Sequence, residues 1–381
     1  MTGDPPGDAA LPERVDVVVV GGGPAGAAAA IRCAGHGLRC ALIDRSEARE
    51  SREPPGETLH PGLEPLFAFL GVAKAVMGAA FRERPEGIAV SWPGTAPRFQ
   101  QYGEDTRGVW RGFHVRRTVL HDILLNRATA LGVPVLRPCR ALAPILHGGR
   151  VGGVRTSLGD IAARLVFDAG GRGHWLGRAL GVRPPKISPP LLSWYGWVKR
   201  SDDDGRPPSL TADATGWTWT APVAEGVLAW VRLDLDFRHR TPDWWPNDLI
   251  DGEPIGRSRA ADVTWRTMEQ HAGPGWYVIG DAGAVFDPAS SHGVLRAIMS
   301  GLAAAHHASR IIQHSADETT EATLFDRWMR SWIERDTHRI EDLYRAFSCW
   351  RGGPCSSPCQ ATRQTGPSAF PVHRNSWSAA F

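Results

Sequence analysis

The sequence predicts an α/β protein in which a parallel β-sheet is interrupted by a mostly antiparallel sheet and followed by helices. Three observations favour this class. Residues 15–34 run from a β-branched segment through a glycine-rich turn into an alanine-rich segment. Residues 175–276 are rich in tryptophan, proline and aspartate and show little helical period. Helical spacing of apolar residues then returns after residue 293, and the length of 381 residues allows more than one domain.

The first elements are predicted to form a βαβ unit. Val15 to Val20 is a β-branched apolar run, which is typical of a buried strand. Pro24 to Ala34 is alanine-rich and helical in character, and Arg39 to Ile43 is a second apolar run that ends at Asp44. Two strands joined by a helix within about 30 residues predict a right-handed crossover and the start of a parallel sheet.

The later elements are predicted from the same patterns. Apolar residues at helical spacing over 115–131 predict a helix that leads into a strand at 134–136. Paired glycines at 148–149 and 152–153 predict the tight turns of a β-meander over 140–158. In chain order, we then expect a short strand at 165–167, just before Asp168, and an antiparallel sheet over 175–276. Another short strand is expected at 276–279, and helices are expected at 294–309 and 322–347.

These patterns divide the chain into a discontinuous dinucleotide-binding domain and an inserted substrate domain. The first is expected at 15–85, 111–172 and 274–315, and the second at 86–110 and 173–273. Residues 1–14 are expected to be a flexible N-terminus and 316–350 a helical segment. Residues 351–381 are rich in Gly, Pro, Ser, Cys and Gln without any period, so a disordered tail is expected there.

Composition excludes several classes of partner. The 43 basic and 40 acidic side chains leave a net charge of +3, too small a surplus to predict nucleic-acid or anionic-membrane binding. The 6 cysteines lack the spacing of a zinc site, so we expect no metal. The acidic, Pro-rich N-terminus does not resemble a signal peptide, and no apolar run of about 18 residues follows. We therefore expect a cytoplasmic protein with no membrane partner.

A glycine-rich motif lies between the first strand and the first helix. Gly21, Gly23 and Gly26 form G-x-G-x-x-G, with Ala25 inside the turn. The first glycine turns the chain, the second admits a pyrophosphate, and the helix N-terminus stabilises its charge. Asp44 follows at the end of the second strand, where a carboxylate accepts hydrogen bonds from a ribose, and Arg45 is included in the predicted cofactor site. The alternative is a purely structural glycine turn.

A second motif carries a family resemblance. Gly280-Asp281-Ala282 is followed by Asp287-Pro288 and by Gly293. Together with the first motif, this string resembles the glutathione-reductase-type FAD fold of the aromatic-hydroxylase and tryptophan-halogenase superfamily. The resemblance implies FAD as the cofactor, with Asp281 on its ribityl chain and Pro288 in the adjoining loop. It also implies that the helix starting near Gly293 points its N-terminus at the flavin pyrimidine.

Three further segments agree with this resemblance. VRRTVLHDILL resembles the family helix whose arginine, here Arg117, reaches the FAD. LVFDAGGR, which contains Asp168 and Arg172, resembles the family strand that ends in Asp-Ala-x-Gly-Arg, and PPGETLHPG resembles the Gly-Glu loop that places Glu57 beside the isoalloxazine. Each of these segments has a purely structural alternative. Arg117 could be a solvated helix residue, Asp168 and Arg172 could be a pair that stabilises a turn, and Glu57 could cap a helix.

Two longer strings narrow the resemblance. DPASSHGVLRAIMSG and GWTWTAP look most like the flavoproteins of tryptophylquinone cofactor biogenesis, the accessory enzymes of quinohemoprotein amine dehydrogenase and of lysine oxidase. GWTWTAP is also similar to the W-x-W-x-I-P of tryptophan halogenases, with Ala221 in place of Ile. The resemblance implies a monooxygenase that uses molecular oxygen and a flavin C4a-hydroperoxide to hydroxylate a tryptophan side chain of a partner polypeptide. His292 is the candidate proton-handling residue, with a hydrogen-bonded loop histidine as the alternative. The Trp-rich sheet is expected to form the substrate wall, with Arg232, Arg238 and Arg240 at its edge.

Other functions stay open. A halogenase needs a lysine before the strand that follows the Gly-Glu loop, and residues 81–92 contain none. The alternatives are an FAD-dependent hydroxylase, halogenase or reductase of a small aromatic or isoprenoid metabolite, and a flavin-binding accessory protein without chemistry. No second G-x-G-x-x-G is present, so electrons are expected from transiently docked NAD(P)H or from a separate flavin reductase.

Overall fold

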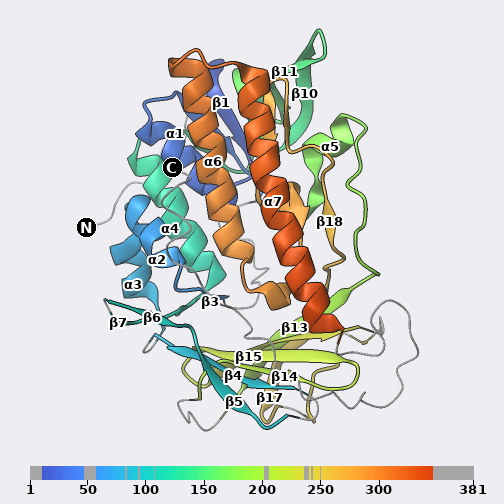
Figure 1. Cartoon of the computed structure of the whole chain (residues 1–381). Helices are drawn as coiled ribbons and strands as arrows, with labels where there is room; N and C mark the ends of the chain where they lie inside the picture. The colour runs from blue at the N-terminus through green and yellow to red at the C-terminus, as the bar shows by residue number, and fades with distance from the viewer. Residues whose placement is uncertain are drawn as a thin grey trace.

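The computed structural model describes residues 11–46, 57–81, 84–92, 95–106, 108–200, 206–235, 240–241, 243–248 and 250–345. Figure 1 shows a β-sheet region at the lower end of the molecule and, above it, a second sheet covered by long helices. The predicted class, a parallel-sheet domain interrupted by a mostly antiparallel sheet and followed by helices, is confirmed.

The upper sheet is built around the predicted βαβ unit. β1 (Arg14–Val20) pairs in parallel with β2 (Cys40–Ile43) on one side and with β12 (Gly159–Asp168) on the other. β20 (Trp276–Val278) also pairs in parallel with β12. Residues 17–19 of β1 are fully buried, because a central parallel strand is covered on both faces. The carboxyl ends of these four strands meet at one edge of the sheet.

Helices cover one face of this sheet, and two of them pack very close to each other. α1 (Pro24–Gly35) crosses α6 (Gly293–Gln313) where both helices carry small residues. A Cβ atom added at Gly301 of α6 would lie 2.3 Å from the carbonyl oxygen of Ala25, so the crossing excludes a side chain there. α4 (Arg117–Ala130) packs beside α1 (Figure 1).

The lower sheet has seven strands among the described residues, in the order β17, β13, β16, β15, β14, β4, β5. Neighbours pair antiparallel, except that β14 and β4 run in parallel. The bounds of these strands in chain order are Gly87–Ser91 (β4), Arg98–Gln101 (β5), Leu192–Lys199 (β13), Ser209–Ala212 (β14), Gly216–Ala224 (β15), Val227–Asp234 (β16) and Glu253–Asp262 (β17).

The other elements connect the two large sheets or extend the upper one. The described strands among them are β3 (Glu57–Leu59), β6 (Glu104–Asp105), β7 (Gly108–Val109), β8 (Phe113–Val115), β9 (Val135–Leu136), β10 (Ala141–His147), β11 (Arg150–Thr156), β18 (Arg266–Thr267), β19 (Ala272–Gly273) and β21 (Ala284–Val285). The described helices among them are α2 (Leu63–Phe69), α3 (Ala73–Ala79), η1 (Gly171–Gly173), α5 (Trp175–Ala179), η2 (Gly280–Ala282), η3 (Pro288–Ser290) and α7 (Glu318–Tyr344).

The elements for which the sequence predicted bounds lie within a few residues of the observed ones, whereas helices α2 and α3 were not predicted. One clear difference is the strand expected at 165–167. That segment is only the end of the ten-residue strand β12. The first half of β12 pairs antiparallel with β11 and alternates buried and exposed residues, so it lacks the continuous apolar run of its buried end. Residues 1–10 and 346–381 lie outside the described residues, and the domain boundaries remain predictions.

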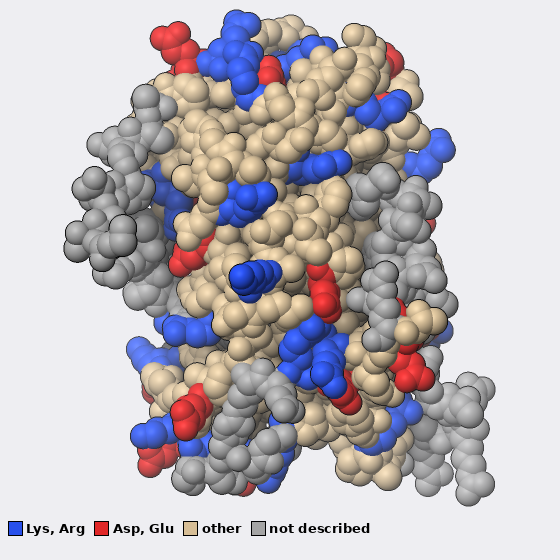
Figure 2. Space-filling view, turned by 90° about the vertical axis from the view of Figure 1, so that its left-hand side faces the viewer, with Lys and Arg blue, Asp and Glu red and all other residues tan. Residues whose placement is uncertain are grey.

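On the face seen in Figure 2, basic and acidic side chains are interspersed among other residues, without large areas of a single charge sign. In the part of the chain that the structure describes, none of the helices is long and apolar enough to cross a membrane.

A buried hydrogen-bond network joins the lower sheet to the helical layer. The indole Nε1 of Trp217 on β15 donates to the hydroxyl of Tyr344 at the end of α7, at 2.7 Å. The Tyr344 hydroxyl bonds in turn to Asp287, which also accepts from Nε1 of Trp265 at 3.2 Å. All four side chains are almost completely buried, so each polar group depends on the others for its partner.

We predict that Tyr344→Phe lowers the free energy of unfolding by about 1–3 kcal/mol, because Trp217 loses its acceptor and Asp287 loses a donor. Chemical denaturation would measure this loss. Tyr277→Phe is the matched control: among the described residues its hydroxyl is buried with no hydrogen-bond partner, so its removal should change stability little. Equal losses in the two variants would contradict the network.

Candidate active site

The three glycines of the first motif have different neighbours. A Cβ atom added at Gly21 would lie 2.4 Å from the carbonyl oxygen of Ala169, and one added at Gly26 would lie 1.9 Å from the carbonyl oxygen of Gly21. At Gly23 an added Cβ would meet nothing within 4 Å. The first and third glycines therefore allow close packing of the chain on itself. The second leaves an open cradle, which is what a dinucleotide pyrophosphate needs.

The first turn of α1 faces this cradle. Gly23 is the N-cap residue, Pro24 follows at the first helical position, and no acidic residue lies in the first turn. The amides of a first helical turn have no partner within the helix, and the helix dipole adds positive potential there. Ala25 is buried, and a Cβ added at Gly280 would lie 2.9 Å from its Cβ, so Ala25 joins the two predicted cofactor motifs by packing.

Asp44 lies at the end of β2, next to the same loop. Its Oδ2 accepts from the amide of Gly22 at 2.5 Å, and its Oδ1 accepts from the amide and the hydroxyl of Ser46. Burial alone would raise the pKa of Asp44, but the bonds from Ser46 and Gly22 hold the pKa below its ordinary value. The group is therefore a carboxylate at neutral pH. Ser46 occupies both lone pairs of Oδ1, so Oδ2, which accepts only from Gly22, keeps a lone pair for a ribose hydroxyl. Arg45, beside it, is exposed.

α4 brings a side chain to this loop that the sequence analysis missed. Nε2 of His121 bonds to the carbonyl oxygen of Gly22. Arg117, the predicted FAD-binding arginine, is the first residue of α4 and is half-buried. One helical turn separates the two residues, so they share a face of the helix, and that spacing was the available signal.

The second cofactor motif lies against the first. Gly280 has a φ of 59°, a conformation that favours glycine, and its amide donates to the hydroxyl of Ser300 at 2.9 Å. Asp281 is half-exposed, and its Oδ2 lies 3.4 Å from Nε of Arg172. The structure thus pairs Arg172 with Asp281 across the strand ends. It does not pair Arg172 with Asp168, the partner that the turn-stabilising alternative assigned to it.

Asp168 is fully buried and bonds to backbone amides. Its Oδ1 accepts from Gly170 and its Oδ2 accepts from Leu176, both at 2.8 Å. Burial raises the pKa of Asp168 to about 6, against the effect of these bonds. Both oxygens therefore hold the turn after β12, but through the backbone and without Arg172, the partner that the structural alternative had assigned.

The loop before α6 is held in an unusual conformation. Asp287 accepts from the amide of Ala289, Pro288 begins the turn η3, and Ser291 has a φ of 52°, which is rare for a residue with a side chain. α6 then begins at Gly293, where an added Cβ would meet nothing within 4 Å. The space beside Gly293 is therefore open, as a flavin placed at this helix N-terminus requires.

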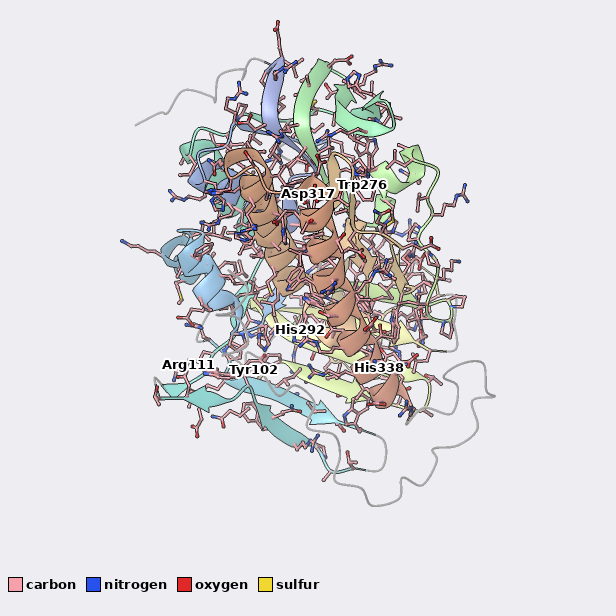
Figure 3. All side chains as sticks on the ribbon, turned by 45° about the horizontal axis from the view of Figure 1, so that its top comes forward. Tyr102, Arg111, Trp276, His292, Asp317 and His338 are labelled. Atoms are coloured by element: carbon pink, nitrogen blue, oxygen red, sulfur yellow. The ribbon has the colours of Figure 1, made fainter. Side chains whose placement is uncertain are left out.

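His292, the N-cap residue of α6, lies in a cluster of titratable side chains. Its Nδ1 is 3.9 Å from Oδ2 of Asp336 on α7, which also pairs with Arg296 at 3.3 Å. The ring of His60 contacts the ring of His292 edge-on, with centroids 5.4 Å apart, and Tyr102 lies 6.2 Å from His60. Figure 3 shows His292 and Tyr102 at the junction of the helices and the lower sheet.

His60 belongs to the Gly-Glu loop and was not singled out in the sequence. Its Nδ1 accepts from the amide of Gly62 at 2.9 Å, and burial lowers its pKa to about 3. It is therefore neutral at physiological pH and places no positive charge beside His292. Glu57, from the same loop, pairs through its backbone with Val115 of β8, and its side chain lies outside the described residues.

The expectation of an arginine edge to a substrate cleft is wrong for two of the three residues. Arg232 is buried and pairs with Asp213 and with Asp234, and Arg240 pairs with the same Asp234. Arg232 lies opposite Thr218 in the β15–β16 register, so it points away from the face that carries Trp217. Arg238 lies outside the described residues.

The tryptophans likewise divide between the two faces of the lower sheet. Trp217 and Trp219 pack on the main core, whereas Trp194, Trp230, Trp244 and Trp245 form a separate cluster on the far face. The wall of a ring-binding site can therefore draw only on part of the Trp-rich region. Within the described residues, no group of three or more His, Cys, Asp or Glu side chains is arranged to hold a metal ion.

Comparisons with known proteins agree with the cofactor site. Residues 16–182 match the family model of FAD-dependent oxidoreductases. The chain is 28% identical to the 1H-pyrrole-2-carbonyl-[peptidyl-carrier protein] chlorinase of Pseudomonas fluorescens, over 87% of this chain and 85% of that protein. It is 27% identical to the digeranylgeranylglycerophospholipid reductase of Methanothrix thermoacetophila, over 88% of each.

Solved structures show the same fold. The flavin-dependent brominase Bmp2 superposes with a TM-score of 0.74 at 22% identity, covering 87% of both chains. A geranylgeranyl bacteriochlorophyll reductase-like protein from Thermoplasma acidophilum superposes with a TM-score of 0.71 at 22% identity, covering 86% of both chains. These likenesses, together with the match of residues 16–182 to FAD-dependent oxidoreductases, support FAD as the cofactor and flavin-dependent oxidoreduction as the chemistry.

We predict that Gly23→Val weakens FAD binding at least about tenfold while the FAD-free protein still folds, at the small cost of a poorer N-cap residue. The φ of Gly23 is −64°, which suits any residue, and its side chain would enter only the cradle. Fluorescence titration would measure the dissociation constant of FAD. Gly26→Ala is the contrasting variant, because its methyl group meets backbone and should destabilise the fold. Wild-type FAD affinity in Gly23→Val would place the cofactor elsewhere.

A second prediction concerns pH and Asp168. Its folded pKa of about 6 exceeds the ordinary aspartate value near 4, so the folded state holds the proton more tightly. Its contribution to stability is present below about pH 4 and is lost as pH rises towards 6. Relative to Asp168→Asn, the wild type should lose about 1–3 kcal/mol of unfolding free energy across this range, measured by denaturation at several pH values. A constant difference would contradict the raised pKa.

Proposed function

We propose that this flavin-dependent oxidoreductase is a monooxygenase that inserts oxygen into an electron-rich aromatic ring. We propose further that the ring is a tryptophan side chain of a partner polypeptide during biogenesis of a tryptophylquinone cofactor. The observation that carries the first step is Arg84, which lies in the segment where the resemblance requires the lysine of a halogenase.

Arg84 is fully engaged by its surroundings. Its Nη2 lies 2.7 Å from Glu64, its Nε donates to the carbonyl oxygen of Gly112 at 3.1 Å, and its guanidinium carbon lies 4.1 Å from the ring centroid of Phe113. A guanidinium also stays charged and has no lone pair for a halogen. Lys74, the one lysine near this segment in the sequence, is on α3. These facts favour transfer of oxygen over transfer of halogen.

The comparisons support a substrate that a protein presents. The chlorinase of Pseudomonas fluorescens and a brominase of Pseudoalteromonas luteoviolacea, 26% identical over 87% of this chain, are named for a pyrrole ring on a peptidyl-carrier protein. An aromatic ring offered by a macromolecule is therefore compatible with this fold. The strings GWTWTAP and DPASSHGVLRAIMSG favour an indole within a polypeptide as the ring presented here.

The chain's own residues have limited tasks in such a reaction. Bound and reduced FAD supplies the oxygen-activating chemistry, with electrons from NAD(P)H or a separate flavin reductase. Half-buried Trp219 and Val231 offer an apolar floor on the sheet face that packs on the core. His292, held beside Asp336, is the side chain proposed to accept the proton that the ring loses. One oxygen atom enters the ring, and the other leaves as water.

A second candidate function is favoured by the relatives themselves. Reductases of isoprenoid substrates, including the Methanothrix enzyme and a menaquinone reductase of Mycobacterium tuberculosis at 27% identity over 77% of this chain, match as broadly as several of the halogenases. An FAD-dependent hydroxylase, halogenase or reductase of a small aromatic or isoprenoid metabolite is therefore the alternative.

Reconstituted turnover separates these functions. The FAD-loaded protein, a flavin reductase, NADH, oxygen and chloride would be combined with a tryptophylquinone-enzyme precursor polypeptide, with free tryptophan, or with menaquinone. We expect mass spectrometry to find oxygen added to tryptophan in the polypeptide, little product from the free amino acid, and no chlorinated product. Hydroxylation of free tryptophan alone would overturn the polypeptide substrate, chlorination would overturn the monooxygenase assignment, and menaquinone reduction would support the alternative.

A further inference from the structure

The two peptide groups that flank Gly22 are hydrogen-bonded by side chains from two different elements. Gly22 does not count in the G-x-G-x-x-G motif, yet a Cβ added there would lie 2.8 Å from Oδ2 of Asp44. The amide of Gly22 donates to that oxygen, which comes from the end of β2. The carbonyl oxygen of Gly22 accepts from Nε2 of His121, which comes from α4. Both ends of this residue are therefore fixed by side chains outside the loop.

The contact determines which tautomer His121 adopts. A carbonyl oxygen cannot donate, so Nε2 must carry the hydrogen. Burial lowers the pKa of His121, although the charge of Asp44 and the Gly22 carbonyl act in the opposite direction, and Arg137 adds to the lowering. The side chain is thus a neutral Nε2–H donor at physiological pH, and it brings no full positive charge to the loop.

Fixing this carbonyl also fixes the next amide. In a trans peptide the C=O of one residue and the N–H of the next point in opposite directions. With the Gly22 carbonyl turned towards α4, the N–H of Gly23 is turned away from α4. Gly23 is the residue beside which the cradle is open, so its amide is available to an anion there.

We propose that His121 is a positioning residue for the cofactor: by holding the Gly22 carbonyl, it presents the Gly23 amide to the pyrophosphate of FAD. The inference rests on FAD as the cofactor and is independent of the proposed monooxygenase reaction. It assigns a role in cofactor affinity to a histidine on the helix for which the family resemblance implies only an arginine.

Affinity measurements on the FAD-free protein test this role. His121→Leu removes the donor and should raise the dissociation constant of FAD about tenfold, the effect of losing one such bond, about 1.4 kcal/mol. His121→Gln places an amide N–H near the position of Nε2 and should stay within about threefold of the wild type. His307→Leu is the matched control. Like His121, His307 is partly buried and paired, in its case with Glu321, but it lies on α6 away from the loop, so FAD affinity should be unchanged.

These affinity measurements distinguish the loss of the His121 hydrogen bond from a packing defect and from failure of the proposed function. Should His121→Leu not fold, His121→Asn keeps a polar side chain too short to reach Gly22, and the same tenfold loss is expected. Unchanged affinity in the folded variant, or equal losses in His121→Leu and His121→Gln, would overturn the proposal. No substrate is needed, so absence of hydroxylation in other assays would leave the result intact.

Discussion

The close approach of the first glycine turn to the turn after β12 is the constraint on which the rest of the site depends. Gly21 meets the backbone of Ala169 and Gly26 meets the backbone of Gly21, with no space for an added side chain at either glycine. This contact is possible only because β1 and β12 run side by side in parallel and end at the same edge. It brings Asp44, Asp168 and Asp281 to that edge from segments far apart in the chain. It also leaves the open side of Gly23 facing the cofactor.

The buried carboxylates at this edge have different tasks. Asp168 and Asp287 hold backbone turns and aromatic N–H or O–H groups, and burial raises the pKa of each to about 6. Asp44 remains a carboxylate because neighbouring amides and hydroxyls stabilise its charge. A negative charge is thus kept where a ribose is expected, while the structural carboxyl groups are the easier ones to protonate.

Much of the fold and half of the site could be predicted from the sequence, because the signals are local. The β-branched run, the glycine spacing and Asp44 lie within one βαβ unit, and Gly280 to Gly293 lies in one loop. His60 and Asp336 could not be predicted, since each acquires its role from a partner on a distant segment. For His121 the only signal was its spacing of one helical turn from Arg117. The prediction that arginines line the edge of a substrate cleft was wrong for a related reason, because only the strand register reveals that Arg232 faces away from Trp217.

The helix α7 contacts the other parts of the molecule at both of its ends and, through Glu321, Asp326 and Asp336, also between them. Glu318 pairs with Arg150 of the β-meander and accepts from the amide of Gly275, and Tyr344 is buried against the lower sheet. Its 27 residues span about 40 Å. A helix anchored in this way opposes hinge motion between the two large sheets, because their separation would expose the buried hydrogen bonds of Tyr344 to water. Entry and release of a substrate are then expected to depend on displacement of surface loops, with the two sheets moving as one rigid frame.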